Sequence, residues 1–193
     1  MGTTQPIRGK DELKKFLNYY QNCQPNIRNY SLVLFGLHTA LRISDILNLN
    51  WEDVYDFDGT CFRDHLFLRE QKTGKENIVA LNNHLKETLK LYMKSRNPAP
   101  EDYLFTKTTN YGRPLSRSQA FRIMKKAAEE TLHTSHVSCH SLRKTFGYHA
   151  WKQGVPPALL MDIFNHSSYG VTKKYLGIEQ DERDSIFMKI DLS

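Results

Sequence analysis

Cysteine is scarce in this sequence, and its three cysteines, Cys23, Cys61 and Cys139, lie far apart. An odd number with no close pair predicts no disulfide framework and favours a reducing compartment. The longest apolar run, residues 32–37, is too short to cross a bilayer, and the first residues show no signal-peptide pattern. We therefore expect a soluble, cytoplasmic protein without a membrane partner.

Internal repeats and low-complexity tracts are also lacking. Hydrophobic residues make up 39% and charged residues 25% of the 193 residues, which is typical of one folded domain and excludes an intrinsically disordered chain. The net charge of +6 is unevenly distributed, since Glu129 and Glu130 are the only acids between residues 103 and 161. That region is the expected contact for a polyanion, although a solvated helix face explains such a run of charge equally well.

The periodicity of apolar residues predicts an α+β protein, mainly α-helical with a small antiparallel three-stranded sheet. Strands are expected at 54–56, 65–68 and 77–81, with turns at 58–59 and 72–75. Helices are expected at 11–21, 27–38, a short segment capped by Ser44, 83–96, a segment from Ser116 to about 132, 140–153, 157–164, 172–175 and 181–189. The sheet is thus inserted into a helical domain that follows a flexible start at residues 1–10.

Two motifs in the second half of the chain carry side chains suited to phosphate chemistry. His140 and Arg143 are three residues apart on a predicted helix, so both can address one phosphate group. His166 follows an apolar helix and precedes Tyr175 by nine residues. For this second pair, the structural alternatives are ordinary packing of the tyrosine and an imidazole that offsets a helix dipole.

Two further motifs lie in the first half. Arg42 stands at a predicted helix entry, and Asp45, three residues later, can orient its guanidinium or form a simple structural ion pair. Lys72 lies in a predicted hairpin turn, where a lysine is usually only solvated. Neither motif indicates a function by itself, so its interpretation depends on the full set of motifs.

In chain order the set is Arg42, Lys72, His140, Arg143, His166 and Tyr175. This set resembles the catalytic domain of the tyrosine recombinases, the phage-integrase type of site-specific recombinase, over about residues 10–180. That family has an arginine in a Leu-Arg-x-Ser-Glu/Asp segment, a hairpin lysine, His-x-x-Arg, a histidine or tryptophan, and a tyrosine nucleophile. Many members have Leu-Gly-His where residues 164–166 read Phe-Asn-His, but asparagine also tolerates the left-handed backbone that often ends a helix.

The resemblance implies a DNA strand transferase that needs no cofactor, metal or ATP. Tyr175 would form a 3′-phosphotyrosyl intermediate, while Arg42 and Arg143 hold the phosphate. His140 would act as general base or hold the phosphate, and His166 would donate a hydrogen bond to it. Lys72 would protonate the leaving 5′-oxygen, and Asp45 would orient Arg42.

The implied partners are double-stranded DNA and further copies of the chain. We expect phosphate contacts from six basic residues: Arg113, Arg117, Arg122, Lys125, Lys126 and Lys144. A monomer in isolation would assemble to a dimer or tetramer on DNA, with the tail at 176–193 exchanged between subunits. Residues 1–193 would form one catalytic domain without a core-binding or arm-binding domain, from a bacterial, phage or other mobile element.

Three alternatives remain open from the residues alone. His133, His136, Cys139 and His140 are zinc-ligand types at tight spacing, although no second ligand pair stands out. A DNA-binding relative that has lost catalysis is opposed by the intact catalytic set. A type IB topoisomerase would use the same chemistry and reseal the same strand, and the motifs do not separate it from a recombinase.

Overall fold

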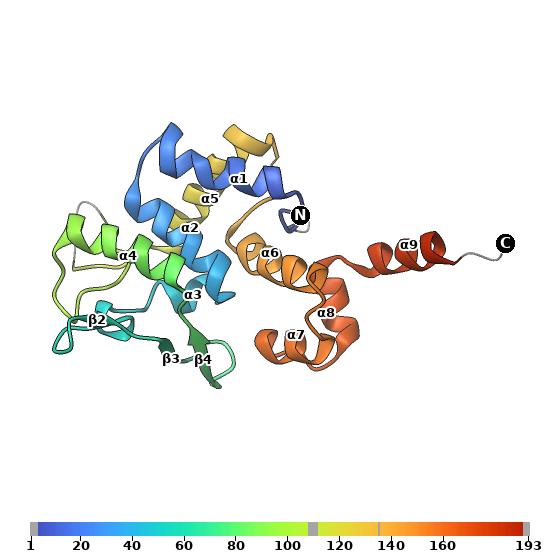
Figure 1. The fold of residues 1–193 in the computed structure, drawn as a ribbon. Helices are drawn as coiled ribbons and strands as arrows, with labels where there is room; N and C mark the ends of the chain where they lie inside the picture. The colour runs from blue at the N-terminus through green and yellow to red at the C-terminus, as the bar shows by residue number, and fades with distance from the viewer. Residues whose placement is uncertain (1–3, 108–111, 135, 191–193) are drawn as a thin grey trace.

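Helices make up most of the chain, as predicted, and two short antiparallel ribbons lie below α3 and α4 in Figure 1. The computed structural model describes residues 4–107, 112–134 and 136–190. The helices are α1 (Lys10–Asn18), α2 (Ile27–Thr39), α3 (Ile43–Ile46), α4 (Asn83–Arg96), α5 (Arg117–Leu132), α6 (Cys139–Lys152), α7 (Pro157–Phe164), α8 (Tyr169–Leu176) and α9 (Glu179–Lys189). The strands are β1 (Tyr55–Asp56), β2 (Cys61–Phe62), β3 (His65–Arg69) and β4 (Glu76–Ala80), and the short turns are a π-helical one at Tyr19–Cys23 and a 3-10 one at Trp51–Asp53.

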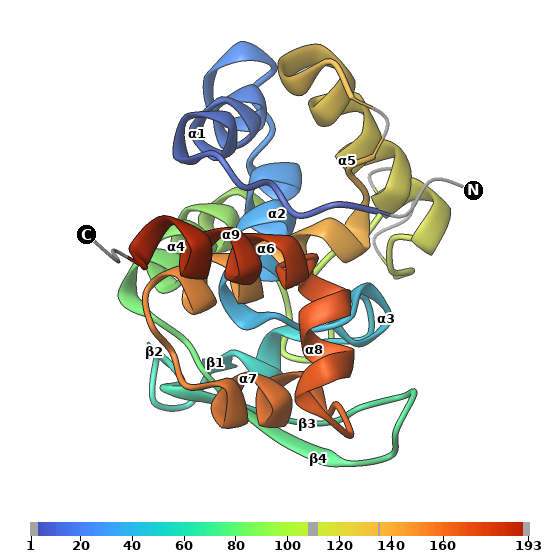
Figure 2. The same ribbon diagram turned by 90° about the vertical axis from the view of Figure 1, so that its right-hand side faces the viewer.

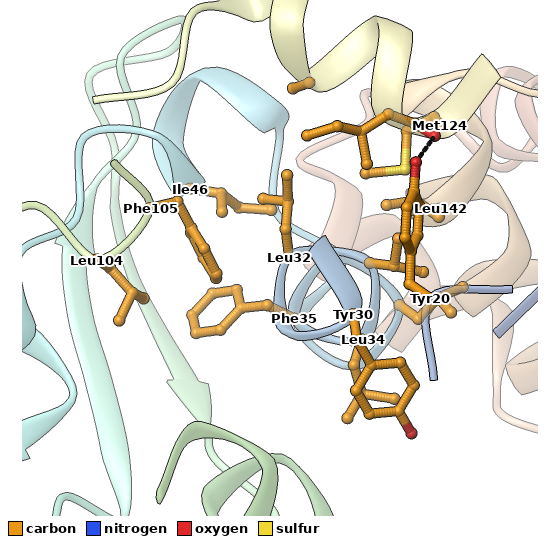
Figure 3. Close-up of a cluster of buried hydrophobic side chains, with 14 of the residues drawn as sticks. Tyr20, Tyr30, Leu32, Leu34, Phe35, Ile46, Leu104, Phe105, Met124 and Leu142 are labelled. Atoms are coloured by element: carbon orange, nitrogen blue, oxygen red, sulfur yellow. Dashed lines mark hydrogen bonds between the residues drawn. The ribbon is translucent and has the colours of Figure 1, made fainter. Parts of the chain in front are cut away.

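The main core is built around α2, which packs against α4 and α6 and is buried on all sides from residue 29 to 37. Its Phe35 ring meets the Phe105 ring edge to face at 5.9 Å, and the Tyr20 hydroxyl donates to the Ile123 carbonyl at 3.0 Å (Figure 3). Burying one large apolar side chain contributes about 1.5–3 kcal/mol. The continuous apolar run of α2 therefore makes it the central helix of the core, against which α4 and α6 pack.

A second, smaller core joins α6 to α7 and α8. It contains Tyr148, Leu160, Phe164 and Leu176, all buried. Gly147 of α6 permits this approach, because a Cβ atom there would lie 2.5 Å from Cζ of Phe164 and 2.6 Å from Cδ2 of Leu176. The close packing holds the ends of α7 and α8 against α6.

The three predicted strands all form, but they belong to two separate ribbons. β1 pairs with β2, which was not predicted, and β3 pairs with β4 from His65↔Ala80 to Arg69↔Glu76. The chain turns back directly after β1, because Oδ1 of Asp56 accepts hydrogen bonds from the backbone N–H groups of Asp58 and Gly59. β1 thus finds its partner locally, and only β3 and β4 form the longer hairpin.

Most predicted helix ends agree with the structure, with two exceptions. Ser116 caps α5 by accepting from the backbone N–H of Gln119, and Asn165 ends α7 in the left-handed region at φ 52°. Ser44 does not cap α3, since the cap position is Arg42 and Ser44 lies inside the helix. The short predicted helix at 172–175 begins earlier, at Tyr169, where Ser168 accepts from the backbone N–H of Val171.

The N-terminal segment and the start of α9 meet beside α6. Residues 4–9 were predicted to be flexible, yet the backbone N–H of Ile7 donates to Oγ1 of Thr145 at 2.9 Å. Arg8 forms an ion pair with Asp181 at 3.1 Å and donates to the Gly177 carbonyl, so it ties the start of α9 to the body. Beyond that tie, α9 projects away from the other helices (Figure 1). Residues 1–3 and 191–193 of these two predicted segments lie outside the described residues.

None of the helices within the described ranges is long and apolar enough to span a bilayer.

Candidate active site

Arg143 lies at the centre of the site, almost fully buried on α6. Its guanidinium donates to the carbonyl of Ala40, at the end of α2, and to the carbonyl of Phe164, at the end of α7, the latter at 3.1 Å. It also lies 4.8 Å from the centre of the Phe164 ring. Three helices therefore fix the position of this one cation.

Arg42 is held by a carboxylate that the sequence did not single out. Its Nη1 atom lies 2.6 Å from Oε2 of Glu70, which is 1% exposed at the end of β3. Glu70 also accepts from the Thr73 hydroxyl at 2.7 Å and from the Asn77 amide at 3.3 Å. Burial acts to raise the pKa of the Glu70 carboxyl, but the hydrogen bonds from Thr73 and Arg42 and the charges of Arg42 and Arg143 outweigh it, so the pKa is lowered. Glu70 is thus an ionised anchor for Arg42 and for the turn that follows it.

Asp45 was expected to orient Arg42, and the structure corrects this prediction. Oδ1 of Asp45 accepts from the backbone N–H of Gln71 at 3.0 Å, so Asp45 fastens the base of the hairpin turn. Burial is the main cause that raises the pKa of the Asp45 carboxyl, and the nearby negative charge of Glu70 adds to it. Arg42 is close enough to lower this pKa by its charge, but its direct partner is Glu70.

Lys72 is exposed in the turn between β3 and β4, as predicted. The turn closes through the backbone N–H of Gly74, which has φ 68° and donates to the Glu70 carbonyl at 2.8 Å. The positive charge of Lys72 contributes to lowering the pKa of His140, which places the lysine within electrostatic reach of α6.

His140 stands in the first turn of α6 with part of its ring exposed. Its pKa is lowered, first because of burial of the rest of the ring and then because of the charges of Lys144, Arg143, Lys72 and Arg42. A neutral imidazole surrounded by cations can accept a proton or hold an anion.

Tyr175 and His166 lie against each other beside Arg143. Their ring centres are 5.0 Å apart in an edge-to-face arrangement, and Nδ1 of His166 lies 3.0 Å from Oγ1 of Thr172. Burial raises the pKa of the Tyr175 phenol, while the charges of Arg143 and Arg42 and a hydrogen bond with Arg143 oppose this shift. Burial also lowers the pKa of His166, and both arginines contribute. The phenol is therefore protonated at neutral pH and stands next to the two guanidinium groups.

The six predicted DNA contacts divide into two groups. Five are exposed: Arg113 lies before α5, and Arg117, Arg122, Lys125 and Lys126 lie along α5. Lys144 lies inside the site instead, where its ammonium donates to the Thr4 carbonyl at 2.7 Å and lies 5.1 Å from the centre of the Tyr175 ring. It contributes positive charge next to the tyrosine rather than an exposed phosphate contact.

The zinc alternative finds no support in the geometry. In the part of the chain that the structure describes, no three or more histidine, cysteine, aspartate or glutamate side chains gather as a metal-binding group. Burial also raises the pKa of the Cys139 thiol to about 11.

Comparison with known proteins places these residues in a family. A family model described as the phage integrase family matches residues 9–182. This chain belongs to the phage integrase family. A probable integrase/recombinase of Bacillus subtilis, YoeC, is 38% identical to this chain, and the match covers 94% of this chain and 93% of YoeC. A tyrosine recombinase of Pseudothermotoga lettingae is 30% identical, and the match covers 91% of this chain but only 57% of that protein.

Solved structures show the same fold. The crystal structure of XerA recombinase has a TM-score of 0.76 at 20% identity and covers 97% of this phage integrase family member and 66% of that chain. The structure of XerH recombinase bound to a palindromic difH substrate after cleavage also has a TM-score of 0.76, at 18% identity, and the match covers 54% of that chain. The architecture is thus that of a tyrosine recombinase catalytic domain, and the chain spans little more than half the length of several of these proteins.

Glu70 and Thr172 are the two residues of the site that the motifs missed. Glu70 stands two residues before Lys72 in the same hairpin, and Thr172 stands one helical turn before Tyr175. A carboxylate close to a hairpin lysine and a hydroxyl one turn before a tyrosine are weak signals by themselves. Only the fold shows which side chains they contact.

Proposed function

We propose that this protein cleaves and rejoins DNA at a specific site through a covalent bond between Tyr175 and a 3′-phosphate. The observation that supports this most strongly is the gathering of Arg143, Arg42 and His166 around Tyr175: Arg143 forms a hydrogen bond with the phenol, Arg42 is close enough to lower its pKa, and the His166 ring lies 5.0 Å from the Tyr175 ring. Arg143 and Tyr175 lie on α6 and α8, Arg42 lies at the cap of α3, and His166 lies just after α7, so the fold assembles them. Membership of the phage integrase family supports the same reaction.

Phosphate binding is the first step of the proposed reaction. A guanidinium has five N–H donors, so the two carbonyl bonds of Arg143 and the single contact between Arg42 and Glu70 leave donors for the non-bridging oxygens. Charge builds on these oxygens in the transition state, and a fixed donor aimed at developing charge is typically worth about 3–4 kcal/mol. Lys144 adds positive charge at the same place.

Proton transfers complete the proposed cleavage. The Tyr175 oxygen attacks phosphorus while its proton passes to the neutral imidazole of His140, and the bond from phosphorus to the 5′-oxygen breaks. Lys72 gives a proton to that 5′-oxygen. A bound phosphate raises the pKa of His166, which then donates from Nε2 to a non-bridging oxygen, because Nδ1 is occupied with Thr172. Rejoining reverses these steps with a 5′-hydroxyl from another strand, and the phosphotyrosyl bond conserves the energy.

Assembly on DNA is proposed to use α9. Phe187 and Met188 of this projecting helix are 78% and 87% exposed, which is a large apolar surface to leave in water. A groove of about 590 Å³ lies between α1 and α6, with Leu13, Leu17 and Phe146 among its lining residues. We expect α9 of one recombinase to pack into this groove on the next when two or more copies bind one DNA site in the cytoplasm.

The test is a covalent trapping assay. Duplexes recovered from a random-sequence pool by binding are nicked next to the cleavage position, so that the cut fragment diffuses away and the adduct accumulates. Tyr175→Phe should bind these duplexes and form no adduct. Tyr169→Phe is the matched control, since Tyr169 lies at the start of the same helix, and it should form the adduct normally. An adduct that persists in Tyr175→Phe would refute the assignment.

A further inference from the structure

One face of α5 carries all of its exposed cations and one exposed aromatic ring. Arg117, Ser118, Phe121, Arg122, Lys125 and Lys126 follow each other in pairs four residues apart and are exposed, so they share one side of the helix. The opposite side, with Ala120, Met124 and Ala127, is buried in the main core. Figure 2 shows α5 at the edge of the molecule beside α1. The core thus fixes the helix while its cationic face stays in solvent.

Phe121 is the exception on this cationic face. It is 47% exposed and forms an open surface together with Arg117, Ser118 and Arg122. Nε of Arg122 donates to the Ser118 carbonyl at 3.3 Å, which keeps that guanidinium along the helix beside the ring. An aromatic ring flanked by guanidinium groups matches a polyanion that presents an apolar group within reach of its charges. Duplex DNA has such a group in its major groove, the C5 methyl of thymine.

Charge also varies along the face. Glu129 and Glu130 occupy the last turns, and Glu129 lies 3.5 Å from Lys125. Phosphates repel these carboxylates but are attracted to Arg117 and to the positive end of the helix dipole. The major groove, about 12 Å wide, admits one α-helix. These charges therefore favour entry of α5 by its N-terminal turns, which carry Phe121, with the acidic end outside the groove.

We propose that Phe121 contacts the C5 methyl group of one thymine in the major groove and so sets a T·A preference at one position of the DNA site. This rests on the proposed function only in so far as α5 must lie on DNA. A protein partner for this face is less favoured, because the face carries four cations beside the ring and the phosphates of a duplex can pair with all of them together.

The test removes the methyl group alone. A duplex is first selected from a random-sequence pool, and each thymine is then replaced in turn by deoxyuridine, which pairs identically. Burying one methyl-sized group is worth about 0.8 kcal/mol, which corresponds to about a fourfold change in Kd. We expect deoxyuridine at one position to raise the Kd of the wild-type protein about fourfold. Phe121→Ala should bind thymine and deoxyuridine at that position with equal affinity.

Leu91→Ala is the matched control, since Leu91 is similarly exposed on α4; it should keep the wild-type response to deoxyuridine. Phe121→Ala should also unfold at the wild-type temperature, because the ring is half exposed. If Phe121→Ala weakens every duplex equally, or keeps the wild-type response, the inference is overturned while DNA binding by α5 stands. If the wild-type protein selects no duplex at all, both this inference and the proposed function fail.

Discussion

Replacing Glu70 with glutamine should loosen Arg42 and the Lys72 turn at the same time. The Glu70 carboxylate contacts Arg42 at 2.6 Å and Thr73 at 2.7 Å. The Glu70 backbone closes the turn, because its N–H donates to the Lys75 carbonyl and its C=O accepts from the Gly74 N–H. Glutamine keeps the shape and some hydrogen bonds but removes the negative charge. Because Glu70 holds both Arg42 and the turn that carries Lys72, both catalytic side chains should become less ordered.

The magnitude follows from burial. The side chain of Glu70 is fully buried and that of Arg42 is 16% exposed, so solvent screens this pair less than a surface pair. A hydrogen bond to a charged group contributes about 1.5–3 kcal/mol, and we expect the free energy of unfolding to fall by about that amount. Complete loss of one donor to a developing charge costs about 100- to 1000-fold in rate. Since Arg42 stays present but unanchored, the cleavage rate should fall by about 10- to 100-fold.

The stability difference should depend on pH. The pKa of Glu70 is lowered in the folded protein, so its contribution is complete above its unfolded pKa of about 4.3 and is lost as pH falls through the folded value. The unfolding free energies of Glu70→Gln and wild type should therefore converge in acid.

Single-turnover cleavage of a trapping duplex and urea unfolding from pH 3 to 7 measure both effects. Glu76→Gln is the control, because it removes an exposed carboxylate from the same hairpin and should change neither quantity. Wild-type cleavage by Glu70→Gln would show that Arg42 does not need this anchor.

Three further predictions concern DNA contact, assembly and metal. Neutralising Lys125 and Lys126 should lower the slope of log binding constant against log salt by about two, whereas neutralising the exposed pair Lys90 and Lys94 on α4 should not; equal slopes would place α5 off the DNA. Removing residues 184–193 should leave binding to a half-site intact and reduce cooperative binding to a full site, and a parallel loss of both would mean that the tail belongs to its own subunit's fold. Cleavage should proceed in excess EDTA, because the arginines and lysines supply the charge that a metal would bring, and a strict requirement for added Mg²⁺ would contradict the mechanism.

Much of the site could be predicted because its residues lie in rigid local patterns. The spacing of His140 and Arg143 places both on one side of α6 whatever the rest of the fold, and Asn165 adopts the left-handed backbone for which asparagine was expected to be suited. The partner of Arg42 could not be found in this way. Arg42 has an extended backbone at the cap of α3, so the rule that residues three apart share a helix face does not hold for Asp45.

The ribbons show a second limit of the sequence. Alternating apolar residues predicted each main strand, but pairing depends on how tightly the chain turns between strands. The hydrogen bonds from Asp58 and Gly59 to the Asp56 side chain close a turn at once, and the Tyr55 and Phe62 rings then pack at 5.0 Å. Glu70 is buried only after the β3–β4 hairpin has folded against α3, so its role depends on tertiary structure.

The most direct test of the central claim is to identify the residue that becomes joined to DNA. The trapped complex is digested with nuclease and protease, and the nucleotide-bearing peptide is sequenced by mass spectrometry. We expect a single phosphotyrosyl peptide, modified at Tyr175 through the 3′-phosphate, with a free 5′-hydroxyl on the released strand. Modification at Tyr169 or at a serine, or strand cleavage without any protein–DNA bond, would contradict the account.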